Sequence, residues 1–244
     1  MMSGIYETIL ASINKQEKLL AVLIDPDKTE LEGLHDFMNR LNASIATHVF
    51  VGGSEVDLEC TGVLVKKLKV LTELPIVLFP GDITQITEHA DGLLFLNLVS
   101  GRNPDYLIHK HVKAAPILRN LDLEVIPTGY ILIENGKETS VQRVTGTQPM
   151  KRSAVQEVVH TAMASEYLGQ KLIYLEAGSG ANLPIDPSMI AEVKNAIEIP
   201  LIVGGGIRTK KELLQAYNAG ADLVVIGTAF EENESFFNEL KSMV

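Results

Sequence analysis

Residues 200–227 form the stretch PLIVGGGIRTKKELLQAYNAGADLVVIG, which has the pattern of one complete strand–helix–strand unit. Two short runs of mostly branched apolar residues, 200–204 and 222–227, are typical of parallel strands buried on both faces. Between them, Thr209 and Glu212 form a capping box at the start of a helix that ends at Gly220. We therefore predict a βαβ unit here, and with it a parallel sheet.

The same alternation runs through the rest of the chain. Six further apolar runs are predicted strands, at 19–24, 47–52, 75–79, 92–97, 123–133 and 171–177. Helix signals lie between them, among them an Asp186-Pro187 start and a Thr29–Glu32 capping box. Eight strands alternating with helices favour a single (β/α)8 TIM barrel domain, residues 1–244, over an open doubly wound sheet.

Two segments depart from the regular pattern. Residues 80–91, between the third and fourth strands, are too few for a full outer helix with two loops, so we expect an irregular or missing third helix. After the fifth strand, Asn135-Gly136 lies between two alternating runs and predicts a β-hairpin. Such a hairpin would lie at the carboxyl ends of the strands, the face that carries the active sites of barrel enzymes.

The composition excludes several classes of protein. A net charge of −10 argues against an open nucleic-acid surface. The single cysteine, Cys60, cannot form an internal disulfide and suits a reducing compartment. No apolar run approaches the roughly 18 residues of a membrane span, and the N-terminus lacks the apolar block of a signal peptide. We therefore expect a cytoplasmic protein without nucleic-acid partners, whose contact with membranes is at most transient.

Three neighbouring loops at the carboxyl ends of predicted strands are rich in glycine. They are YLEAGSGA (174–181), GGGIRT (204–209) and GTAF (227–230). Glycine loops that lead into helices offer backbone N–H groups and positive dipole ends to a phosphate. One such loop would most simply be a short turn, but three adjacent loops favour a phosphate-bearing substrate.

Two carboxylates are placed to act beside these loops. Asp25 follows the first strand and Ser54 the second, so their oxygens could hold Mg²⁺ together with substrate phosphates; Asp25 could equally be a structural residue of an Asp-Pro turn. Glu176 ends the sixth strand and could be a general base, because burial would raise its pKa. Alternatively it forms an ion pair inside the barrel with Lys28 or Arg208.

Six motifs, in order along the chain, closely resemble those of the geranylgeranylglyceryl phosphate synthase family, whose near relatives are the heptaprenylglyceryl phosphate synthases. They are LIDPDK (23–28), VGGS (51–54), PTGYILIENG (127–136), YLEAGSGA (174–181), IVGGGIRT (202–209) and IGTAFE (226–231). The resemblance implies a TIM barrel with an irregular third helix and a homo-oligomer, either dimer or hexamer. It also implies Mg²⁺-dependent transfer of a prenyl group from an allylic prenyl diphosphate to the 3-hydroxyl of sn-glycerol 1-phosphate.

The resemblance further implies a set of site residues. Asp25 and Ser54 would be the Mg²⁺ ligands, and Tyr130 would line the site close to the prenyl chain. Glu176 would contact the glycerol hydroxyls and serve as the catalytic base, with Asp25 as the second catalytic residue. The glycerol phosphate would lie against Tyr174, Leu175, Glu176, Ala177, Gly178, Ser179, Gly180, Gly205, Gly206, Gly227 and Thr228.

A prenyl tail requires an apolar groove, because each fully buried CH₂ contributes about 0.8 kcal/mol. We expect this groove between residues 98–108 and the irregular segment after Phe79. We favour a C20 geranylgeranyl tail, with a longer tail as the alternative. Tyr106 would either limit the depth of the groove or serve only in packing.

Two other functions share parts of this pattern. A phosphosugar isomerase-type barrel also carries GGGI and GT loops, but it would need an acid–base pair at the ends of strands one and five, and Pro127 to Tyr130 offer no carboxylate. A non-catalytic sensor of a phosphate ligand would have little use for both Asp25 and Glu176 in the mouth of the barrel.

Overall fold

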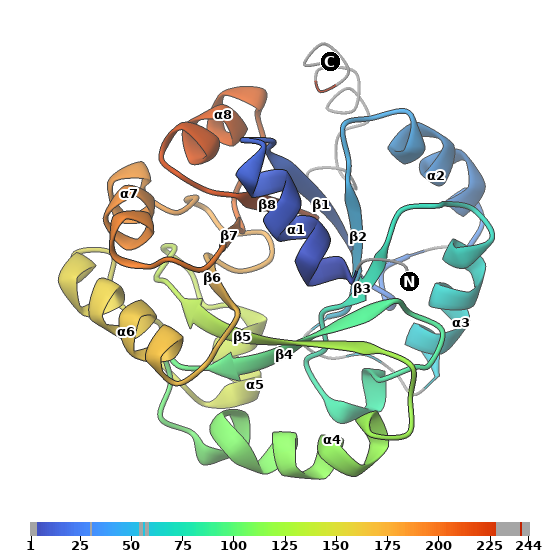
Figure 1. Cartoon of the computed structure of the whole chain (residues 1–244), viewed down its shortest axis with the longest axis horizontal. Coiled ribbons are helices and arrows are strands. Elements are labelled where there is room, and N and C mark those ends of the chain that lie inside the picture. Colours follow the sequence, from blue (N-terminus) through green and yellow to red (C-terminus); the bar gives the residue numbers. More distant parts are fainter. Residues whose placement is uncertain (1–3, 30, 54–55, 57–58, 228–239, 241–244) are drawn as a thin grey trace.

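The protein, seen in a computed structural model, is a closed barrel of parallel strands in which β8 pairs with β1 (Figure 1). The structure describes residues 4–29, 31–53, 56, 59–227 and 240. The strands are β1 (Leu19–Ile24), β2 (His48–Val51), β3 (Ile76–Leu78), β4 (Gly92–Leu98), β5 (Glu124–Leu132), β6 (Leu172–Glu176), β7 (Leu201–Gly204) and β8 (Leu223–Ile226). The predicted TIM barrel is confirmed, and each predicted strand agrees with the observed one to within one residue at either end.

Most of the helices surround the barrel on its outside (Figure 1). The helices are α1 (Ile5–Asn14), α2 (Leu34–Asn42), α3 (Cys60–Lys69), α4 (Lys110–Leu118), α5 (Ser140–Thr145), α6 (Val155–Tyr167), α7 (Pro187–Ala196) and α8 (Lys210–Asn218). A 3₁₀ turn, η1 (Ile83–Gln85), stands between β3 and β4, and a π-helical segment, η2 (Asp105–His109), leads into α4. The helix expected to be irregular or missing was the one after the third strand, between β3 and β4. The short η1 stands in that place, so the expectation is confirmed.

The alternation of side chains along each strand divides the core into two parts. In β6, Leu172 and Tyr174 belong to the cluster inside the barrel, whereas Ile173 and Leu175 belong to the cluster between the barrel and the helices. Side chains two residues apart share a face of a strand. Glu176 therefore points into the barrel with Leu172 and Tyr174, at the carboxyl end of its strand.

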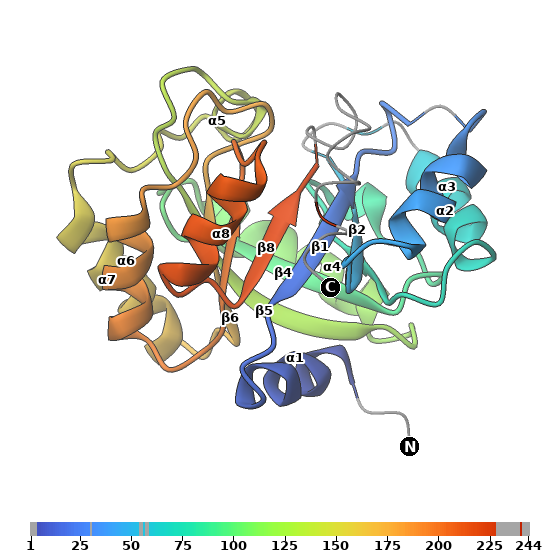
Figure 2. The same ribbon diagram turned by 90° about the horizontal axis from the view of Figure 1, so that it is seen from above.

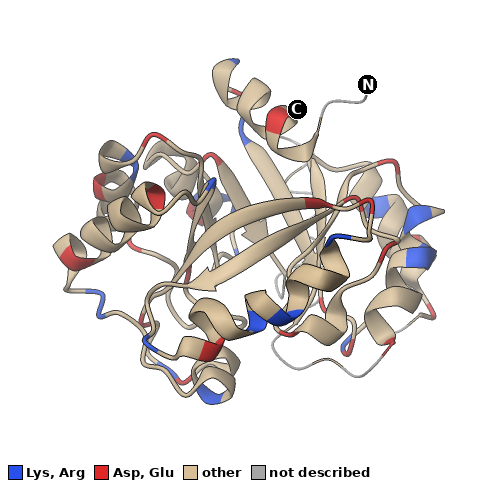
Figure 3. Ribbon diagram, turned by 60° about the horizontal axis from the view of Figure 1, so that its bottom comes forward, with Lys and Arg blue, Asp and Glu red and all other residues tan. Residues whose placement is uncertain are grey.

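Charged side chains lie mainly on the helices and loops, and the strands are almost free of them (Figure 3). Glu124, the first residue of β5, and Glu176, the last of β6, are the only Asp, Glu, Lys or Arg residues in the described strands. They lie at opposite ends of the barrel. Because charges are rarely left in such a core without partners, each carboxylate calls for a specific explanation.

Glu124 is explained by helix α1, which lies across the amino ends of the strands (Figure 2). Its carboxylate accepts hydrogen bonds from the backbone N–H of Ile5 and, at 3.1 Å, of Tyr6, in the first turn of α1. Ile9 of the same helix packs into the inner core. A carboxylate at a helix N-terminus satisfies free N–H groups and the positive end of the dipole.

Helix starts were predicted with mixed success. Thr209 and Asp186 cap α8 and α7 as expected. The Thr29–Glu32 capping box is wrong: α2 begins only at Leu34, after Gly33 in the left-handed conformation, without a side-chain cap. The Thr29 hydroxyl instead donates to the Asp25 carbonyl at 2.7 Å, so the turn after β1 uses the group that would have capped the helix.

The predicted hairpin at Asn135-Gly136 is also wrong. The chain turns after Ile133, which forms an isolated parallel bridge with Met150, and then enters α5. A capping box of Thr139 and Gln142 starts that helix. The side chain of Asn135 is buried and bonded to the Ala177 carbonyl, so the turn packs against the loop after β6 instead of continuing as a strand.

We predict that Glu124→Ala lowers the free energy of unfolding by about 1–2 kcal/mol, because it removes both acceptors from the first turn of α1. Glu124→Gln keeps an oxygen acceptor but loses the charge, and should lose less. Urea denaturation followed by circular dichroism measures both values. Equal stability of Glu124→Ala and wild type would contradict the assigned role of Glu124.

Candidate active site

A polar cavity opens at the carboxyl ends of the strands, on the side of β1, β5, β6, β7 and β8. Most of the described residues that were predicted to bind substrate or metal line it. These are Asp25, Tyr130, Tyr174, Glu176, Gly178, Ser179, Gly180, Gly205, Gly206 and Gly227. The side chains of Leu175 and Ala177 instead face the outer core, as strand alternation requires. Ser54 and Thr228 lie outside the described residues.

Glu176 is the buried carboxylate of this cavity, with only 5% of its surface exposed. Its Oε1 accepts a hydrogen bond from the Gly178 N–H at 2.5 Å. Burial raises the pKa of this carboxyl group, while the Gly178 N–H and the Tyr174 hydroxyl act in the opposite direction. The alternative of an ion pair is not supported: Lys28 pairs with Asp25 at 2.9 Å, and the Arg208 guanidinium donates to the Ala181 carbonyl at 2.8 Å.

The three consecutive glycines that end β7 and follow it, 204–206, make room for this arrangement. A Cβ on Gly204 would lie 2.3 Å from the Tyr174 hydroxyl, and one on Gly205 would lie 2.5 Å from Glu176 Oε1. Gly205 and Gly206 also have φ values of +84° and +73°, which other residues rarely adopt. The space that the sequence suggested for a ligand is thus used first by the protein's own Glu176 and Tyr174.

Two tyrosines and a phenylalanine form an aromatic group beside Glu176. The ring of Tyr174 lies 5.3 Å from that of Phe79 and 5.4 Å from that of Tyr130. Burial, and secondarily the charge of Glu176, raises the pKa of both tyrosines well above the usual value, so both hydroxyls stay protonated. Among the described residues the buried Tyr174 hydroxyl has no well-aligned hydrogen-bond partner, but the nearby Glu176 carboxylate interacts with it.

Asp25 lies on the opposite wall of the cavity, at the end of β1. Its Oδ1 accepts from the Asp27 N–H at 3.2 Å, and its Oδ2 pairs with Lys28. The backbone of Gly53, the residue before Ser54, lies against the same carboxylate, since a Cβ on Gly53 would be 2.9 Å from Asp25 Oδ1. Gln85 of η1 holds Gly53 there by donating to its carbonyl at 2.8 Å.

The described residues contain no group of three or more His, Cys, Asp or Glu side chains that could hold a metal ion. Mg²⁺, however, is often held by one or two carboxylates together with substrate phosphates and water. Asp25, at the wall of the polar cavity with Asp27 nearby, fits that second kind of site and not an all-protein cage.

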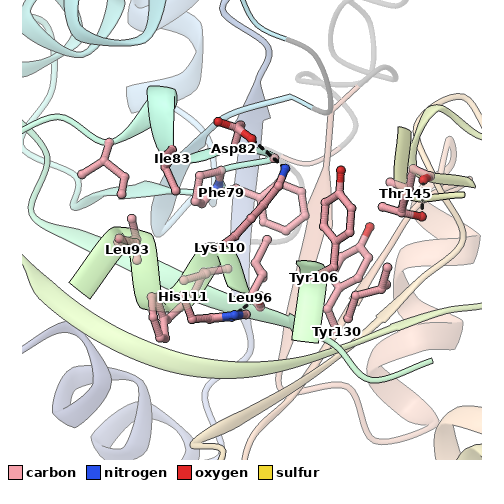
Figure 4. A pocket seen from close by; sticks show the side chains of 18 of the residues that line it. Phe79, Asp82, Ile83, Leu93, Leu96, Tyr106, Lys110, His111, Tyr130 and Thr145 are labelled. Atoms are coloured by element: carbon pink, nitrogen blue, oxygen red, sulfur yellow. Dashed lines mark hydrogen bonds and ion pairs between the residues drawn. The ribbon is translucent and has the colours of Figure 1, made fainter. Parts of the chain in front are cut away.

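An apolar cavity adjoins the polar one (Figure 4). It lies between η1, β4, η2 and α4, where a groove was expected, and its wall includes Ile83, Leu93 and Leu96. The short η1 in place of a full helix leaves this side of the barrel open. Both cavities share Gly53, Phe79, Tyr130 and Val141 in their walls, so they meet at the aromatic group.

Tyr106 and Lys110 cross this apolar cavity (Figure 4). The Lys110 ammonium lies 2.6 Å from Asp82 Oδ2 and 4.2 Å from the centre of the Tyr106 ring. The Tyr106 hydroxyl donates to the Val144 carbonyl at 3.2 Å. Tyr106 therefore lines the groove, as expected, and also ties η2 to α5.

Two contributions to the site were missed from sequence. Val141 of α5 lines both cavities, and Asn135 in the turn before that helix holds the loop after Glu176. The signal was present in Asn135-Gly136, but it was interpreted as a hairpin. In the part of the chain that the structure describes, no helix is both long and apolar enough to cross a membrane.

Comparisons with known proteins agree with this site. Residues 12–244 match the PcrB family model. Geranylgeranylglyceryl phosphate synthase of Flavobacterium johnsoniae is 53% identical over 98% of both chains, and that of Methanosphaera stadtmanae is 35% identical over 97% of both. The crystal structure of (S)-3-O-geranylgeranylglyceryl phosphate synthase from Thermoplasma acidophilum, in complex with sn-glycerol-1-phosphate, superimposes with a TM-score of 0.92 at 29% identity, covering 100% of this chain and 98% of that one. The chain therefore belongs to the PcrB family of prenyltransferases, with geranylgeranylglyceryl phosphate synthases among its relatives.

Proposed function

We propose that this protein transfers a prenyl group from an allylic prenyl diphosphate to the 3-hydroxyl of sn-glycerol 1-phosphate, with Mg²⁺, and releases diphosphate. The observation that carries the proposal is the junction of two unlike cavities at Phe79 and Tyr130. One is apolar and suits a prenyl tail; the other is polar, lined by glycine backbone and contains a buried carboxylate. The Thermoplasma acidophilum relative with sn-glycerol-1-phosphate bound supports the identity of the acceptor.

The polar cavity accounts for binding of the acceptor. Glycines 178, 180, 205 and 206 bring backbone to its wall without side chains in the way. Helix α8, capped by Thr209, begins at Lys210, shortly after the 204–206 stretch, and adds the positive end of a helix dipole. In this mechanism the phosphate of glycerol 1-phosphate lies against these loops, which directs its hydroxyls toward Glu176.

Glu176 then accepts the proton of the 3-hydroxyl as its oxygen attacks the allylic carbon. The new C–O bond forms to that carbon, while the bond from the carbon to diphosphate breaks and its electron pair leaves with the diphosphate. Mg²⁺ held by Asp25 and Ser54 would stabilise the negative charge of the leaving group. Holding both reactants in line supplies much of the acceleration.

The donor is proposed to be geranylgeranyl diphosphate. The groove beside η1 is lined by apolar side chains, and burial of each CH₂ there would contribute about 0.8 kcal/mol. Tyr106 stands in its wall with both its ring and its hydroxyl engaged, which supports a limit on the tail. Among the curated relatives, the name geranylgeranylglyceryl phosphate synthase points to the same C20 chain.

The outer surface of η2 and α4 supports assembly into a dimer or hexamer. Ile108, Val112 and Ile117 are 53%, 63% and 42% exposed there. Ile108 and Val112 are one helical turn apart, so their exposed side chains lie side by side, and exposed apolar side chains on an outer helix can form a contact between subunits. We therefore propose that the protein is a homo-oligomer.

A phosphosugar isomerase has no support in the structure. The single charged residue of β5, Glu124, lies at the amino end of the strand and is bonded to α1. It cannot act in a site at the carboxyl ends of the strands.

The proposed activity is tested by incubating the protein with sn-glycerol 1-phosphate, Mg²⁺ and labelled C15, C20 or C35 diphosphate. We expect an ether product with the C20 donor and less with the others, because Tyr106 in the wall would limit a longer tail and a C15 tail would bury fewer CH₂ groups. Mass spectrometry identifies the product. No ether product from any of the three donors would refute the proposed function.

We predict that Glu176→Gln lowers kcat by about 10²–10⁴-fold while the KM for glycerol phosphate changes little, because the amide fills the same space but accepts no proton. The raised pKa of Glu176 also predicts that kcat/KM of the wild type rises with pH through a midpoint above that of an ordinary glutamate. That rise should be missing in Glu176→Gln. A loss of affinity that equals the loss of rate would argue against Glu176 as the base.

We predict that Asp25→Asn abolishes Mg²⁺-dependent transfer and leaves the thermal unfolding midpoint almost unchanged, because only one carboxylate oxygen is replaced. Asp36→Asn, an exposed carboxylate on α2, is the matched control and should keep full activity. Turnover is measured over a range of Mg²⁺ concentrations. Wild-type turnover in Asp25→Asn would remove Asp25 from the metal site.

A further inference from the structure

The peptide group between Ala177 and Gly178 is held from both sides. Its carbonyl accepts a hydrogen bond from Asn135 Nδ2, and its N–H donates to Glu176 Oε1 at 2.5 Å. In a planar trans peptide the C=O and N–H bonds point in opposite directions. Holding the carbonyl on one side therefore sets the direction of the N–H on the other side, toward Glu176.

The side chain of Asn135 is itself fixed in orientation. It is 1% exposed, and its Oδ1 accepts from the Lys137 N–H at 3.2 Å, which closes an Asx turn. With the amide reversed, an oxygen would face the Ala177 carbonyl and an NH₂ group would face the Lys137 N–H. Only the observed orientation makes both bonds.

The backbone at Gly178 needs such support more than most positions. Its φ of +100° lies in the region that favours glycine, and a glycine has no side chain to restrict rotation of the adjoining peptide. The Thr139 methyl group packs against it, 2.4 Å from where a Cβ would lie. Turn 135–137 and the start of α5 together therefore hold the loop that follows β6.

The other groups near Glu176 come from different elements. Tyr174 of β6 and Tyr130 of β5 face the carboxylate with protonated hydroxyls. The backbone of Gly205 covers it from the side of β7. The other charged side chains lining the same cavity are Asp25, Asp27, Lys28 and Arg208. Lys137, two residues after Asn135, also brings its ammonium close to the loop after β6, 3.1 Å from where a Cβ on Gly180 would lie.

We propose that Asn135 is a positioning residue for the proposed base: by binding the Ala177 carbonyl, it aims the Gly178 N–H at Glu176 and orients the carboxylate toward the acceptor. The inference rests on the proposed function, in which Glu176 takes the proton of the 3-hydroxyl. It gives the Asn135-Gly136 motif a role in catalysis, although the side chain touches no substrate.

The test compares Asn135→Ala and Asn135→Ser with wild type. Serine can still accept from the Lys137 N–H but is too short to reach the Ala177 carbonyl. Asn135→Ser therefore removes the hydrogen bond to Ala177 and keeps the turn. Asn182→Ala, an exposed asparagine near Gly136, is the matched control. The measurements are kcat and kcat/KM for glycerol 1-phosphate against pH, with C20 diphosphate and Mg²⁺, and the unfolding midpoint of each variant.

We expect both Asn135 variants to shift the acidic limb of kcat/KM to higher pH and to lose activity about tenfold below its midpoint, because burial then acts on Glu176 without the opposing N–H. The KM for the prenyl donor should not change. If wild type shows the expected acidic limb of kcat/KM and the folded Asn135 variants show it at the same pH, the role of Asn135 is overturned. The proposed function would then stay intact.

A second readout does not depend on activity. In NMR spectra a short hydrogen bond to a carboxylate should place the Gly178 amide proton far downfield, and that signal should move upfield in Asn135→Ser and in Glu176→Gln alike. The same chemical shift of the Gly178 amide proton in wild type and Asn135→Ser would refute the proposal that Asn135 orients this N–H. Absence of prenyl transfer in wild type, with the NMR result as expected, would refute the proposed function and the catalytic role of Asn135 while leaving the geometry in place.

Discussion

The burial of a single carboxylate, Glu176, is the constraint around which the mouth of the barrel is arranged. No cation among the described residues forms an ion pair with it, so its charge relies on the Gly178 N–H and on the neighbouring Tyr174 hydroxyl. A buried charge without such partners would be costly. Gly204 and Gly205 follow from the same constraint, because a Cβ on either would displace Tyr174 or the carboxylate.

The second organising feature is the short turn η1, which stands between β3 and β4 where a regular barrel has an outer helix. This short turn leaves one side of the barrel open and gives a wall of apolar side chains between β4 and α4. The opening meets the polar cavity at Phe79 and Tyr130, so an apolar tail and a phosphate-bearing head can be held in contact. The irregular segment therefore gives the site an apolar cavity beside the polar one.

The elements were predicted well where the signal is local. Strands of this barrel are near-continuous apolar runs, and Thr209 with Glu212 carries the whole of its capping box within four residues. Prediction failed at Thr29 and at Asn135. Thr29 was interpreted as a helix cap and Asn135 as part of a hairpin turn, but their side chains donate to the Asp25 and Ala177 carbonyls. Asn135 binds Ala177, 42 residues away, and no local pattern reveals such a partner.

The sequence by itself determined the parallel barrel, the irregular third segment and the concentration of glycines and carboxylates at one end of the strands. These follow from the periodicity of apolar residues and from turn and cap chemistry, which act over a few residues. Only the tertiary structure decided that the glycines after β7 accommodate Glu176 and Tyr174, that Lys28 pairs with Asp25, and that Asn135 steadies the loop after β6. The Lys28–Asp25 pair forms within the turn after β1, but the other two outcomes depend on the pairing of β5, β6 and β7, which brings residues far apart in the sequence into contact.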